Sequence, residues 1–351
     1  MSKNHAIVVQ KPGEAAKEEV PVPKLRDDYI LVKVKAVALN PTDWKHVDFL
    51  TSKGCHIGCD YAGTVEEVGS KVTKEFRKGD RIAGFAHGGN EVYHEDGAFG
   101  NYITVKGDAQ LKIPENLSFE EASTLGVGIT TVGQGLYQSL GLPRPNSTSS
   151  EKKQILIYGG STATGALAIQ YAKLSGFEVI TTCSKHNFDY VKSLGADAVF
   201  DYTEPNCGAS INTHTNNTLV YAFDCISEGT SPSIIATALS TILPSQYSNL
   251  LAVSADEVRK INEKVQLKST LGYTVFGEYF KFGTMEFPPM EENFEFGKAF
   301  WNEAGELLGE GKVRVHKPSV NKFGTSFEGI LAGMQAMREG KVSGEKLVFT
   351  L

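Results

Sequence analysis

The sequence predicts an α/β protein made of a small β-barrel and a doubly wound parallel sheet, on three observations. Residues 6–115 contain short β-branched and apolar runs at close spacing, which are typical of a barrel. From residue 155 onward, strand-like and helix-like patterns alternate, as they do in a parallel sheet wound on both faces. Residues 305–351 return to mixed character. We therefore expect a discontinuous barrel domain at 1–117 and 315–351, and a wound domain at 118–314.

The barrel prediction rests on four strand-like runs. They are Ala6–Gln10, Tyr29–Leu39, Tyr61–Gly69 and Ile82–Phe85. Prolines at positions 21 and 23 mark the connector between the first two runs, and a tight turn at 78–81 precedes the last. Short strands joined by such turns are expected to close into a small barrel.

A change of pattern near residue 115 predicts a helix and then a loop. Ser118 is a good N-cap and Glu121 follows three residues later, which is a capping box for a helix at 117–122. Small residues and hydroxyls from Gly126 to Leu140 predict close packing. The stretch Leu142–Lys153 is rich in Pro, Ser, Asn and Thr, and it is expected to be a surface loop.

The wound domain is expected to contain six strands. They are Ile155–Tyr158, Val179–Thr182, Ala198–Phe200, Leu219–Cys225, Leu250–Val253 and Leu267–Val275. Helices are expected between them, including Asn187–Leu194 and Ser233–Leu243. After this domain, Val313–His316 and Lys346–Leu351 are expected to be strands, with an amphipathic helix at Phe327–Glu339 between them.

The turn after the first wound strand has the character of a nucleotide-binding loop. Gly159–Gly165 is a small-residue turn that opens a helix, and such a turn sets a dinucleotide pyrophosphate on a helix N-terminus. The three glycine positions of the fingerprint fall at residues 160, 162 and 165. The first and third are glycines, and Thr162 replaces the middle one. We expect Thr162 to keep the backbone from approaching the pyrophosphate as closely as a glycine would, while its hydroxyl can donate to a phosphate oxygen. The alternative is a loop of small residues with no ligand.

The end of the second wound strand indicates which nucleotide is bound. An Asp or Glu there would accept a hydrogen bond from the ribose 2′-hydroxyl of NAD(H). This chain instead has Ser184, Lys185 and His186, which offer donors and positive charge to a 2′-phosphate. The sequence therefore predicts NADP(H). Tyr202, just past the next strand, is expected to lie near the adenosine.

Bulk properties exclude several classes of function. The 351 residues are 41% hydrophobic and 22% charged, which is ordinary for a globular protein of two domains. The formal net charge of −6 argues against nucleic acid or an acidic membrane as the main partner. No apolar run approaches the ~20 residues that span a bilayer. Residues 1–5 lack the apolar core of a signal peptide, so a cytoplasmic protein is expected.

The five cysteines are expected to be reduced thiols. Their number is odd and they are scattered along the chain. Cys55 and Cys59, with His56 between them, have the look of a metal pair. No second pair lies nearby in the sequence, so the site would lack ligands and no metal is expected.

Several motifs together carry a resemblance to a known superfamily. They are Asn40–Asp43, Gly58–Gly69, Gly79–Arg81, Gly159–Gly165 and Gly344–Lys346. On these residues the chain resembles the zinc-free branch of the medium-chain dehydrogenase/reductase superfamily over nearly its whole length. Zinc-dependent members would have Cys at position 40, Gly-His-Glu at 58–60 and a four-cysteine lobe near 90–105. This chain has Asn, Gly-Cys-Asp and no such lobe.

Within that branch the chain is most similar to the fungal trans-acting enoyl reductases that partner polyketide synthases. The resemblance rests on 42–45, 159–165, 184–187 and 271–277. It implies a GroES-like barrel with a Rossmann domain, a monomer or a homodimer, and an acyl thioester substrate carried by a polyketide synthase acyl carrier protein.

The resemblance also implies roles for individual residues. The implied NADPH contacts are Thr42, Asp43, Trp44, Lys45, Ser161, Thr162, Ala163, Thr164, Ser184, Lys185, His186, Asn187, Tyr202, Leu243, Val342 and Ser343. The implied acyl-substrate lining is Gly126, Val127, Gly128, Ile129, Thr130, Thr131, Val132, Gly133, Thr274, Val275, Phe276 and Gly277.

Enoyl reduction needs hydride at the β-carbon and relief of the charge that develops on the thioester oxygen, which oriented donors can supply. Lys45 and Thr130 are the catalytic candidates. Lys45 can bond the nicotinamide ribose, stand near the oxyanion or be a surface lysine; Thr130, like Thr131, can contact the substrate or only pack. Related enoyl reductases use a tyrosine shortly after the Asn-Pro turn, but residues 44–49 contain none. The proton donor is thus unassigned, and water is one candidate. His46, His87 and His94 are expected to be solvated or structurally bonded.

Three hypotheses follow. The first is an NADPH-dependent enoyl reductase acting on carrier-bound acyl chains. The second is a zinc-independent quinone or enone reductase. Comparing activity on small quinones with activity on crotonyl-type thioesters would distinguish it from the first. The third is a non-catalytic NADPH-binding structural protein, which would bind NADPH tightly without turnover.

Overall fold

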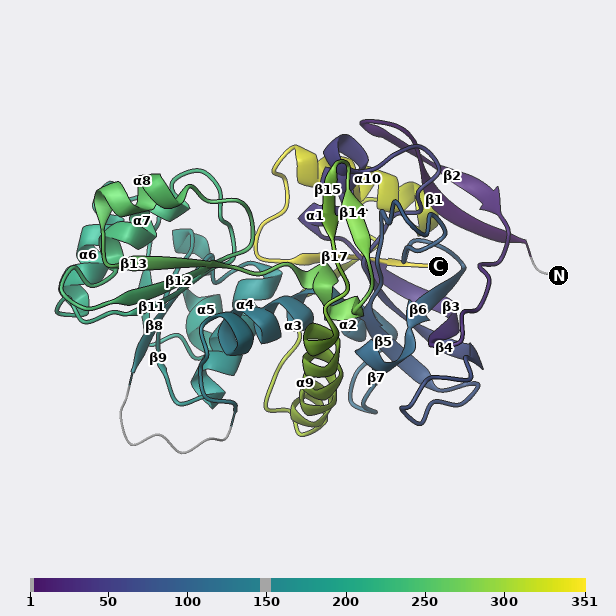
Figure 1. Cartoon of the computed structure of the whole chain (residues 1–351), viewed down its shortest axis with the longest axis horizontal. Coiled ribbons are helices and arrows are strands. Elements are labelled where there is room, and N and C mark those ends of the chain that lie inside the picture. The colour runs from purple at the N-terminus through teal and green to yellow at the C-terminus, as the bar shows by residue number, and fades with distance from the viewer. Residues whose placement is uncertain (1–2, 146–152) are drawn as a thin grey trace. The chain divides into compact units, whose positions relative to one another are not determined.

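The computed structural model describes residues 3–145 and 153–351. The chain forms two compact units, one of Met1–Thr130 with Gly272–Leu351 and one of Thr131–Leu271 (Figure 1). Each is described by itself below. The predicted loop Leu142–Lys153 lies partly outside the described residues. No helix in the described ranges has the length and apolarity needed to cross a membrane.

The first unit is built on a barrel sheet, as expected, in which every pair of described strands is antiparallel except one parallel pair at the edge. Its strands, in spatial order, are β16 (Pro318–Val320), β17 (Lys346–Thr350), β3 (Tyr29–Ala38), β4 (Asp60–Val68), β5 (Arg81–Phe85) and β7 (Gln110–Lys112), and β6 (Tyr102–Lys106) also pairs with β3. Two separate hairpins complete the strands, β1 (Asn4–Lys11) with β2 (Glu14–Val20), and β14 (Phe280–Phe282) with β15 (Met285–Phe287). Residues 318–350 thus return to this sheet as β16 and β17, next to β3.

The register of β3 with its two neighbouring strands determines where Asn40, Asp60 and Lys346 lie. Ala38 pairs with Asp60 of β4 on one side and with Val348 of β17 on the other. Asn40 lies two residues beyond Ala38, and Lys346 lies two residues before Val348. The two antiparallel pairings therefore bring Asn40, Asp60 and Lys346 to the same end of the sheet.

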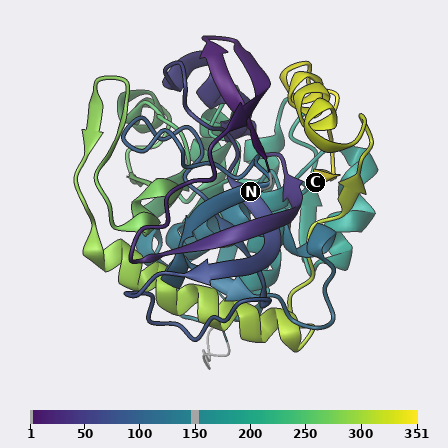
Figure 2. The same cartoon turned by 90° about the vertical axis from the view of Figure 1, so that its right-hand side faces the viewer.

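Helices of the first unit cover this sheet. They are α1 (Pro41–Lys45), α2 (Phe119–Ala122), α9 (Glu291–Gly309) and α10 (Ser326–Arg338), with the π-helical turn η1 (His46–Leu50) and the 3₁₀ turns η2 (Gly107–Ala109) and η5 (Gly272–Phe276). The predicted capping box forms, because Ser118 accepts from the Glu121 N–H and Glu121 accepts from the Ser118 N–H. Helix α9, which contacts β7, is drawn along one side of the barrel strands in Figure 2.

The second unit is a six-stranded parallel sheet, as predicted. The spatial order is β10 (Ala198–Phe200), β9 (Glu178–Thr182), β8 (Gln154–Tyr158), β11 (Tyr221–Asp224), β12 (Ser245–Asn249) and β13 (Val265–Ser269). Its helices are α4 (Ala163–Leu174), α5 (Phe188–Ser193), α6 (Cys207–His214), α7 (Ser231–Ala238) and α8 (Ala255–Ile261), with the 3₁₀ turn η4 (Lys185–Asn187). The order reverses between β8 and β11, which is the switch point of a doubly wound sheet. Helix α3 (Gly126–Val132) and the π-helix η3 (Gly133–Ser139) span the boundary in sequence between the units.

The described unit boundaries differ from the expected 1–117, 118–314 and 315–351. Residues 118–130 and 272–314 belong to the barrel unit. The reason is packing: α2 contacts β3, β4 and β5, and α9 contacts β7. Sequence pattern shows that helices exist there but not which sheet they cover.

Two predicted strands were wrong. The apolar stretch Leu250–Val253 follows β12 instead of forming it, because the polar segment Ser245–Asn249 is the buried strand and its hydroxyls and amides bond internally, as in the Ser139 Oγ bond to Ser248 Oγ at 2.8 Å. Residues Val313–His316 are not a strand; β16 begins at Pro318. The expected last wound strand ends early, at Ser269, and its remainder becomes η5.

Candidate functional site

The glycine turn of the second unit joins β8 to α4 tightly. Gly159 has φ of +81°, a conformation that glycine adopts without strain. A Cβ on Gly160 would lie 2.1 Å from Thr181 Oγ1, and one on Gly165 would lie 2.2 Å from the Gly159 carbonyl oxygen. Glycine at both positions therefore lets the turn, β9 and the start of α4 pack closely, and the backbone N–H groups at the start of α4 are where a phosphate would bind. The turn fits the pyrophosphate of a dinucleotide.

Thr162 has a structural role in this turn. Its hydroxyl donates to the Gly159 carbonyl oxygen at 2.8 Å and accepts from the Gly165 N–H at 3.0 Å, so it is the N-cap of α4. The hydroxyl hydrogen is used inside the turn, contrary to the expectation that it donates to a phosphate oxygen. Ser161, Ala163 and Thr164 stand beside it, all partly exposed.

Replacing Thr162 tests this capping role. We expect Thr162→Ala to lower the free energy of unfolding by about 0.5–2 kcal/mol, because α4 loses its N-cap. Thr162→Ser keeps the hydroxyl and should be close to the wild type. Denaturant unfolding followed by circular dichroism measures both. Equal stability of the Ala and Ser variants would contradict the role.

The carboxyl end of β9 holds the predicted phosphate donors together with two acids. Ser184 Oγ donates to the Tyr202 hydroxyl at 3.3 Å, so these two predicted residues are neighbours. The Lys185 ammonium lies 2.8 Å from Glu204 and 3.8 Å from Asp201. Because Lys185 and Glu204 are exposed, their pair is easily exchanged for another anion. His186 and Asn187 bond to each other at 3.2 Å in the following turn.

Leu243 does not lie at the same end of the sheet as Ser184 and Lys185. It precedes β12, and β12 runs parallel to β8 and β11, so Leu243 lies at the amino end of the sheet. The glycine turn and Ser184 follow the carboxyl ends of their strands. By the same topology Leu250, directly after β12, lies at the carboxyl edge.

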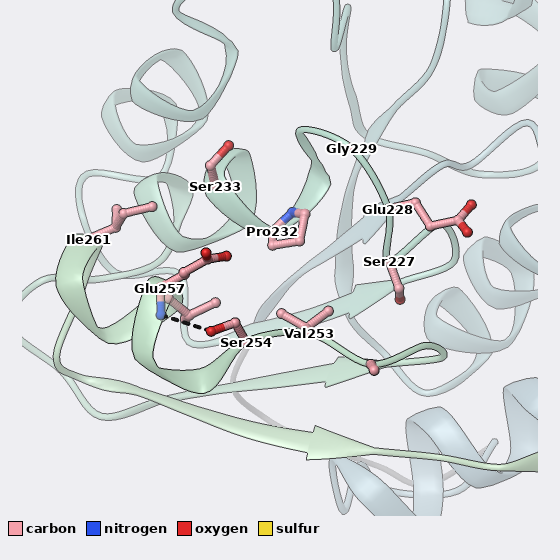
Figure 3. Close-up of a pocket in the computed structure, with 11 residues that line it drawn as sticks. Ser227, Glu228, Gly229, Pro232, Ser233, Val253, Ser254, Glu257 and Ile261 are labelled. Atoms are coloured by element: carbon pink, nitrogen blue, oxygen red, sulfur yellow. Dashed lines mark hydrogen bonds between the residues drawn. The ribbon is translucent and has the colours of Figure 1, made fainter.

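A pocket of about 560 Å³ also lies at the carboxyl ends of β11 and β12 (Figure 3). It is lined by Ser227, Glu228, Gly229, Pro232, Ser233, Ala252, Val253, Ser254, Glu257, Val258 and Ile261. Its charged side chains are both carboxylates. This pocket contains none of the predicted cofactor residues, and its charge does not suit a phosphate.

In the first unit, α1 and the following turn present Thr42 to a cluster of buried rings. Thr42 Oγ1 lies 2.9 Å from the Tyr273 hydroxyl, and Cys59 Sγ lies 3.3 Å from that same hydroxyl. His46 Nδ1 lies 2.8 Å from the Thr42 carbonyl oxygen. A carbonyl only accepts, so Nδ1 carries the proton of a neutral ring. Burial lowers the pKa of His46 to about 4.

The Asp43 side chain points inward. It is 1% exposed, and its Oδ2 accepts from the Asn40 N–H at 2.6 Å. Burial raises its pKa to about 7, helped by the nearby Asp60 carboxylate and opposed by the Asn40 bond and the Lys346 ammonium. A cofactor contact by Asp43 would have to use its backbone.

Asn40, Asp60 and Lys346 form a buried ion pair with an amide partner. The Lys346 ammonium lies 2.8 Å from Asp60 Oδ2 and donates to Asn40 Oδ1 at 2.5 Å. Lys346 is 4% exposed and Asp60 is fully buried. Asp60 Oδ1 accepts from the Val127 N–H at 2.6 Å, which fixes the start of α3.

This arrangement does not fit zinc. The positions where zinc-dependent members would carry ligands hold an amide, a thiol and a carboxylate, and the carboxylate is already neutralised by a lysine ammonium. Burial and the Asp43 carboxyl also raise the pKa of the Cys59 thiol well above its usual value, which disfavours the thiolate a metal requires. In the part of the chain that the structure describes, no group of three or more His, Cys, Asp and Glu residues could hold a metal. Cys55 contacts Ser52 and the Asn90 carbonyl instead.

The predicted acyl-lining segments are packed closely. A Cβ on Gly126 would lie 2.4 Å from Asp60 Oδ1, so only glycine fits there. The Thr130 hydroxyl accepts from the Trp301 indole N–H at 3.2 Å and is 4% exposed. Asn293 donates to Thr274 Oγ1 at 2.8 Å. Gly128, Ile129, Thr131, Val132, Gly133, Val275, Phe276 and Gly277 complete these segments, and all of them except Gly277 are buried. The Thr130 contact favours a packing role for that hydroxyl.

The remaining predicted residues are at least partly accessible. The Lys45 ammonium lies 5.7 Å from the Trp44 ring, and both side chains are half-buried. Val342 and Ser343 lie in the connection between α10 and β17, with Ser343 exposed. Of the histidines His46, His87 and His94, the first two are buried. Burial lowers the pKa of His87 well below its usual value, so it is neutral.

Sequence reasoning missed the residues beneath these segments. Tyr273, Cys59, Asp60 and Lys346 touch predicted site residues, yet none was assigned a role. The signal for Asp60 and Lys346 was an acid and a base at the ends of apolar strands. Nothing in the sequence showed that they pair.

Family models match both parts of the chain. The alcohol dehydrogenase GroES-like domain matches residues 26–115, and the zinc-binding dehydrogenase family matches residues 163–279. The second family is named for zinc binding, but Asn40, Cys59 and Asp60 of this chain do not form a zinc site.

Curated relatives share a common description. The chain is 47% identical over 352 residues to the trans-enoyl reductase ACTTS2 of Alternaria alternata, which covers 100% of both chains. It is 54% identical over 301 residues to the trans-enoyl reductase TOXD of Cochliobolus carbonum, covering 86% of this chain and 99% of the relative. It is also 45% identical to the trans-enoyl reductase resD of Aspergillus sclerotiorum, over 98% and 99% of the two chains.

Solved structures agree with the fold. The CurK enoyl reductase superposes with a TM-score of 0.79 at 16% identity over 99% of each chain. Mycobacterial Rv1454c in complex with NADPH gives a TM-score of 0.75 at 18% identity over 100% of each chain. Taken with the curated relatives, the barrel and the wound sheet show that the chain belongs to the trans-enoyl reductase family of the medium-chain dehydrogenase/reductase superfamily, and it is an oxidoreductase acting on activated carbon–carbon double bonds.

Proposed function

We propose that the chain is a trans-acting enoyl reductase that uses NADPH to reduce α,β-unsaturated acyl thioesters carried by a polyketide synthase acyl carrier protein. The observation that carries the cofactor assignment is the pair Ser184 and Lys185 at the carboxyl end of β9, where an NAD-binding protein would have an acid. Relatives named as trans-enoyl reductases support the reaction class.

The cofactor supplies a hydride for the β-carbon. The turn at Gly159–Gly165 binds its pyrophosphate through backbone N–H groups at the start of α4. Ser184 and Lys185 bind its 2′-phosphate, and Lys185 exchanges the Glu204 carboxylate for that phosphate. These two carboxylates, Asp201 and Glu204, lower the affinity that an unopposed lysine would give.

In the first unit, the start of α3 and the segment Thr274–Gly277 line the acyl chain. The buried Lys346–Asp60 pair holds the start of α3, because Asp60 accepts from Val127. Glu278 holds the other segment by accepting from the Tyr29 hydroxyl at 2.8 Å and from Lys106 at 2.8 Å. Fixed lining of this kind orients the double bond and excludes water.

The assay that tests this function compares acceptors at fixed NADPH. NADPH oxidation is expected with crotonyl-type thioesters, and more efficiently when the enoyl group is on a carrier protein than on a short thiol. Small quinones should be poor acceptors. Turnover of quinones without thioester turnover would instead make the chain a quinone or enone reductase. Tight NADPH binding with no turnover of any activated alkene would leave only the structural role.

A further inference from the structure

A line of hydrogen-bonding groups runs from the interior of the first unit to Thr42. Tyr273 OH lies 3.3 Å from Cys59 Sγ and 2.9 Å from Thr42 Oγ1. Tyr273 is 6% exposed and Cys59 is 1% exposed, whereas Thr42 is half-buried. Thr42 is therefore the point at which this line meets the surface of the unit.

The hydrogen bonds around Thr42 Oγ1 allow its hydroxyl to donate outward. His46 Nδ1 carries a proton, because it bonds the Thr42 carbonyl oxygen, and the same N–H is 3.0 Å from Thr42 Oγ1. If Tyr273 also donates to Thr42 Oγ1, that oxygen has two donors and its own hydrogen can point outward. His46 itself is a poor acid, because burial keeps it neutral.

Beyond the inner end of the line lies an acid, Asp43, whose carboxyl adds to burial in raising the pKa of the Cys59 thiol. Burial raises the pKa of Asp43 to about 7. The charged and titratable groups facing this carboxyl are Asp60 on β4, Lys346 on β17, the Cys59 thiol and the Tyr273 hydroxyl; the Asn40 N–H is a further contact. A carboxyl with this pKa is partly protonated near neutral pH and can supply a proton.

We propose that Thr42 delivers the proton to the α-carbon of the substrate, and that Tyr273 positions the Thr42 hydroxyl and restores its proton. The inference rests on the enoyl reduction proposed above. It assigns a proton donor in a chain whose residues 44–49 offer no tyrosine.

The cofactor's hydride brings an electron pair to the β-carbon, and the π electrons of the double bond move to the α-carbon and thioester carbonyl. The Thr42 O–H bond breaks as an α-carbon–hydrogen bond forms. Thr42 takes the Tyr273 proton, Tyr273 takes the Cys59 proton, and Cys59 takes the Asp43 proton. Asp43 ends as a carboxylate, and after product release a proton from water returns to it along the same line through Thr42, because Asp43 itself is 1% exposed.

Tyr273→Phe is the variant that isolates this role. It keeps the ring packed against Phe85 and His87 and removes only the hydroxyl. We expect kcat to fall at least about tenfold with KM nearly unchanged, because proton transfer and not binding is impaired. Thr42→Val should lose about 100-fold or more in kcat, and Thr42→Ser should recover most of it.

Two readouts separate proton delivery from a structural effect. In the wild type, kcat should fall as pH rises through about 7, since Asp43 must be protonated; Tyr273→Phe should lose that inflection. With an α-methyl enoyl thioester in D₂O, the wild type should give one configuration at the α-carbon and Tyr273→Phe a mixture. NADPH affinity and thermal unfolding of each variant check its fold.

Tyr279→Phe is the matched control, because Tyr279 is an exposed tyrosine six residues away in the same unit, 39% exposed. It should match the wild type in every readout. Wild-type kcat, pH profile and α-configuration in Tyr273→Phe would overturn the inference while leaving the enoyl reductase intact. A wild-type chain that reduces no enoyl thioester would refute the proposed function, and the inference with it.

Discussion

Lys346→Met is expected to lower the free energy of unfolding by about 3–5 kcal/mol, as removal of one member of a buried ion pair does. The Asp60 carboxylate is fully buried, and Lys346 is the cation beside it. Without the ammonium, the buried Asp60 carboxylate loses the cation that lies 2.8 Å from it. Asn40 Oδ1 also loses its donor. Thermal and denaturant unfolding measure the loss.

The double variant Lys346→Met with Asp60→Asn separates charge from packing. An asparagine keeps an oxygen for the Val127 N–H and carries no charge. We expect the loss of unfolding free energy in the double variant to be smaller than the sum of the two single-variant losses by about 1–3 kcal/mol. Lys322→Met is the control, since Lys322 pairs with Glu345 at a site where the lysine is 43% exposed, and it should cost less than about 1 kcal/mol. A Lys346→Met variant as stable as this control would contradict the buried pair.

Ser184→Ala with Lys185→Asp is expected to shift the ratio of kcat/KM for NADPH over NADH toward NADH by about 100-fold or more. The change removes two donors to the 2′-phosphate, each charge-assisted bond being worth about 1.5–3 kcal/mol, and it adds a repelling carboxylate. The new aspartate can also accept from a ribose 2′-hydroxyl. Steady-state kinetics with both cofactors measure the ratio.

Glu204→Gln is the companion variant for this surface. It removes the carboxylate that lies 2.8 Å from Lys185 and is expected to strengthen NADPH binding several-fold with little effect on NADH. Opposite signs in the two variants would locate the 2′-phosphate at Lys185. Unchanged NADPH affinity in Ser184→Ala with Lys185→Asp would place the phosphate elsewhere.

The fold was predictable where the pattern and the environment agree. The strands at 154–158 and 178–182 are apolar runs bounded by a glycine turn and polar residues, and both lie buried in the parallel sheet. The strand at 245–249 was missed because its buried residues are Ser, Tyr and Asn, whose polar atoms are satisfied inside the protein. Hydrophobicity cannot identify such a strand.

The candidate site was predictable in the same uneven way. Ser184 and Tyr202 could be inferred because each follows a strand end, and they are neighbours in the structure. Glu204 was missed because its approach to Lys185 depends on how the chain turns after β10. Tyr273 and Lys346 depend on long-range pairings, and one sequence does not show which buried groups meet.

We propose that this chain transfers hydride from NADPH to the β-carbon of a carrier-bound enoyl thioester. The most direct measurement is a single turnover with NADPH deuterated at its transferable position, a crotonyl-type acyl carrier protein and a chelator present, followed by mass spectrometry of the released acyl group. We expect one deuterium, located at the β-carbon, with no loss of rate on chelation. A product without deuterium, or activity that the chelator abolishes, would contradict it.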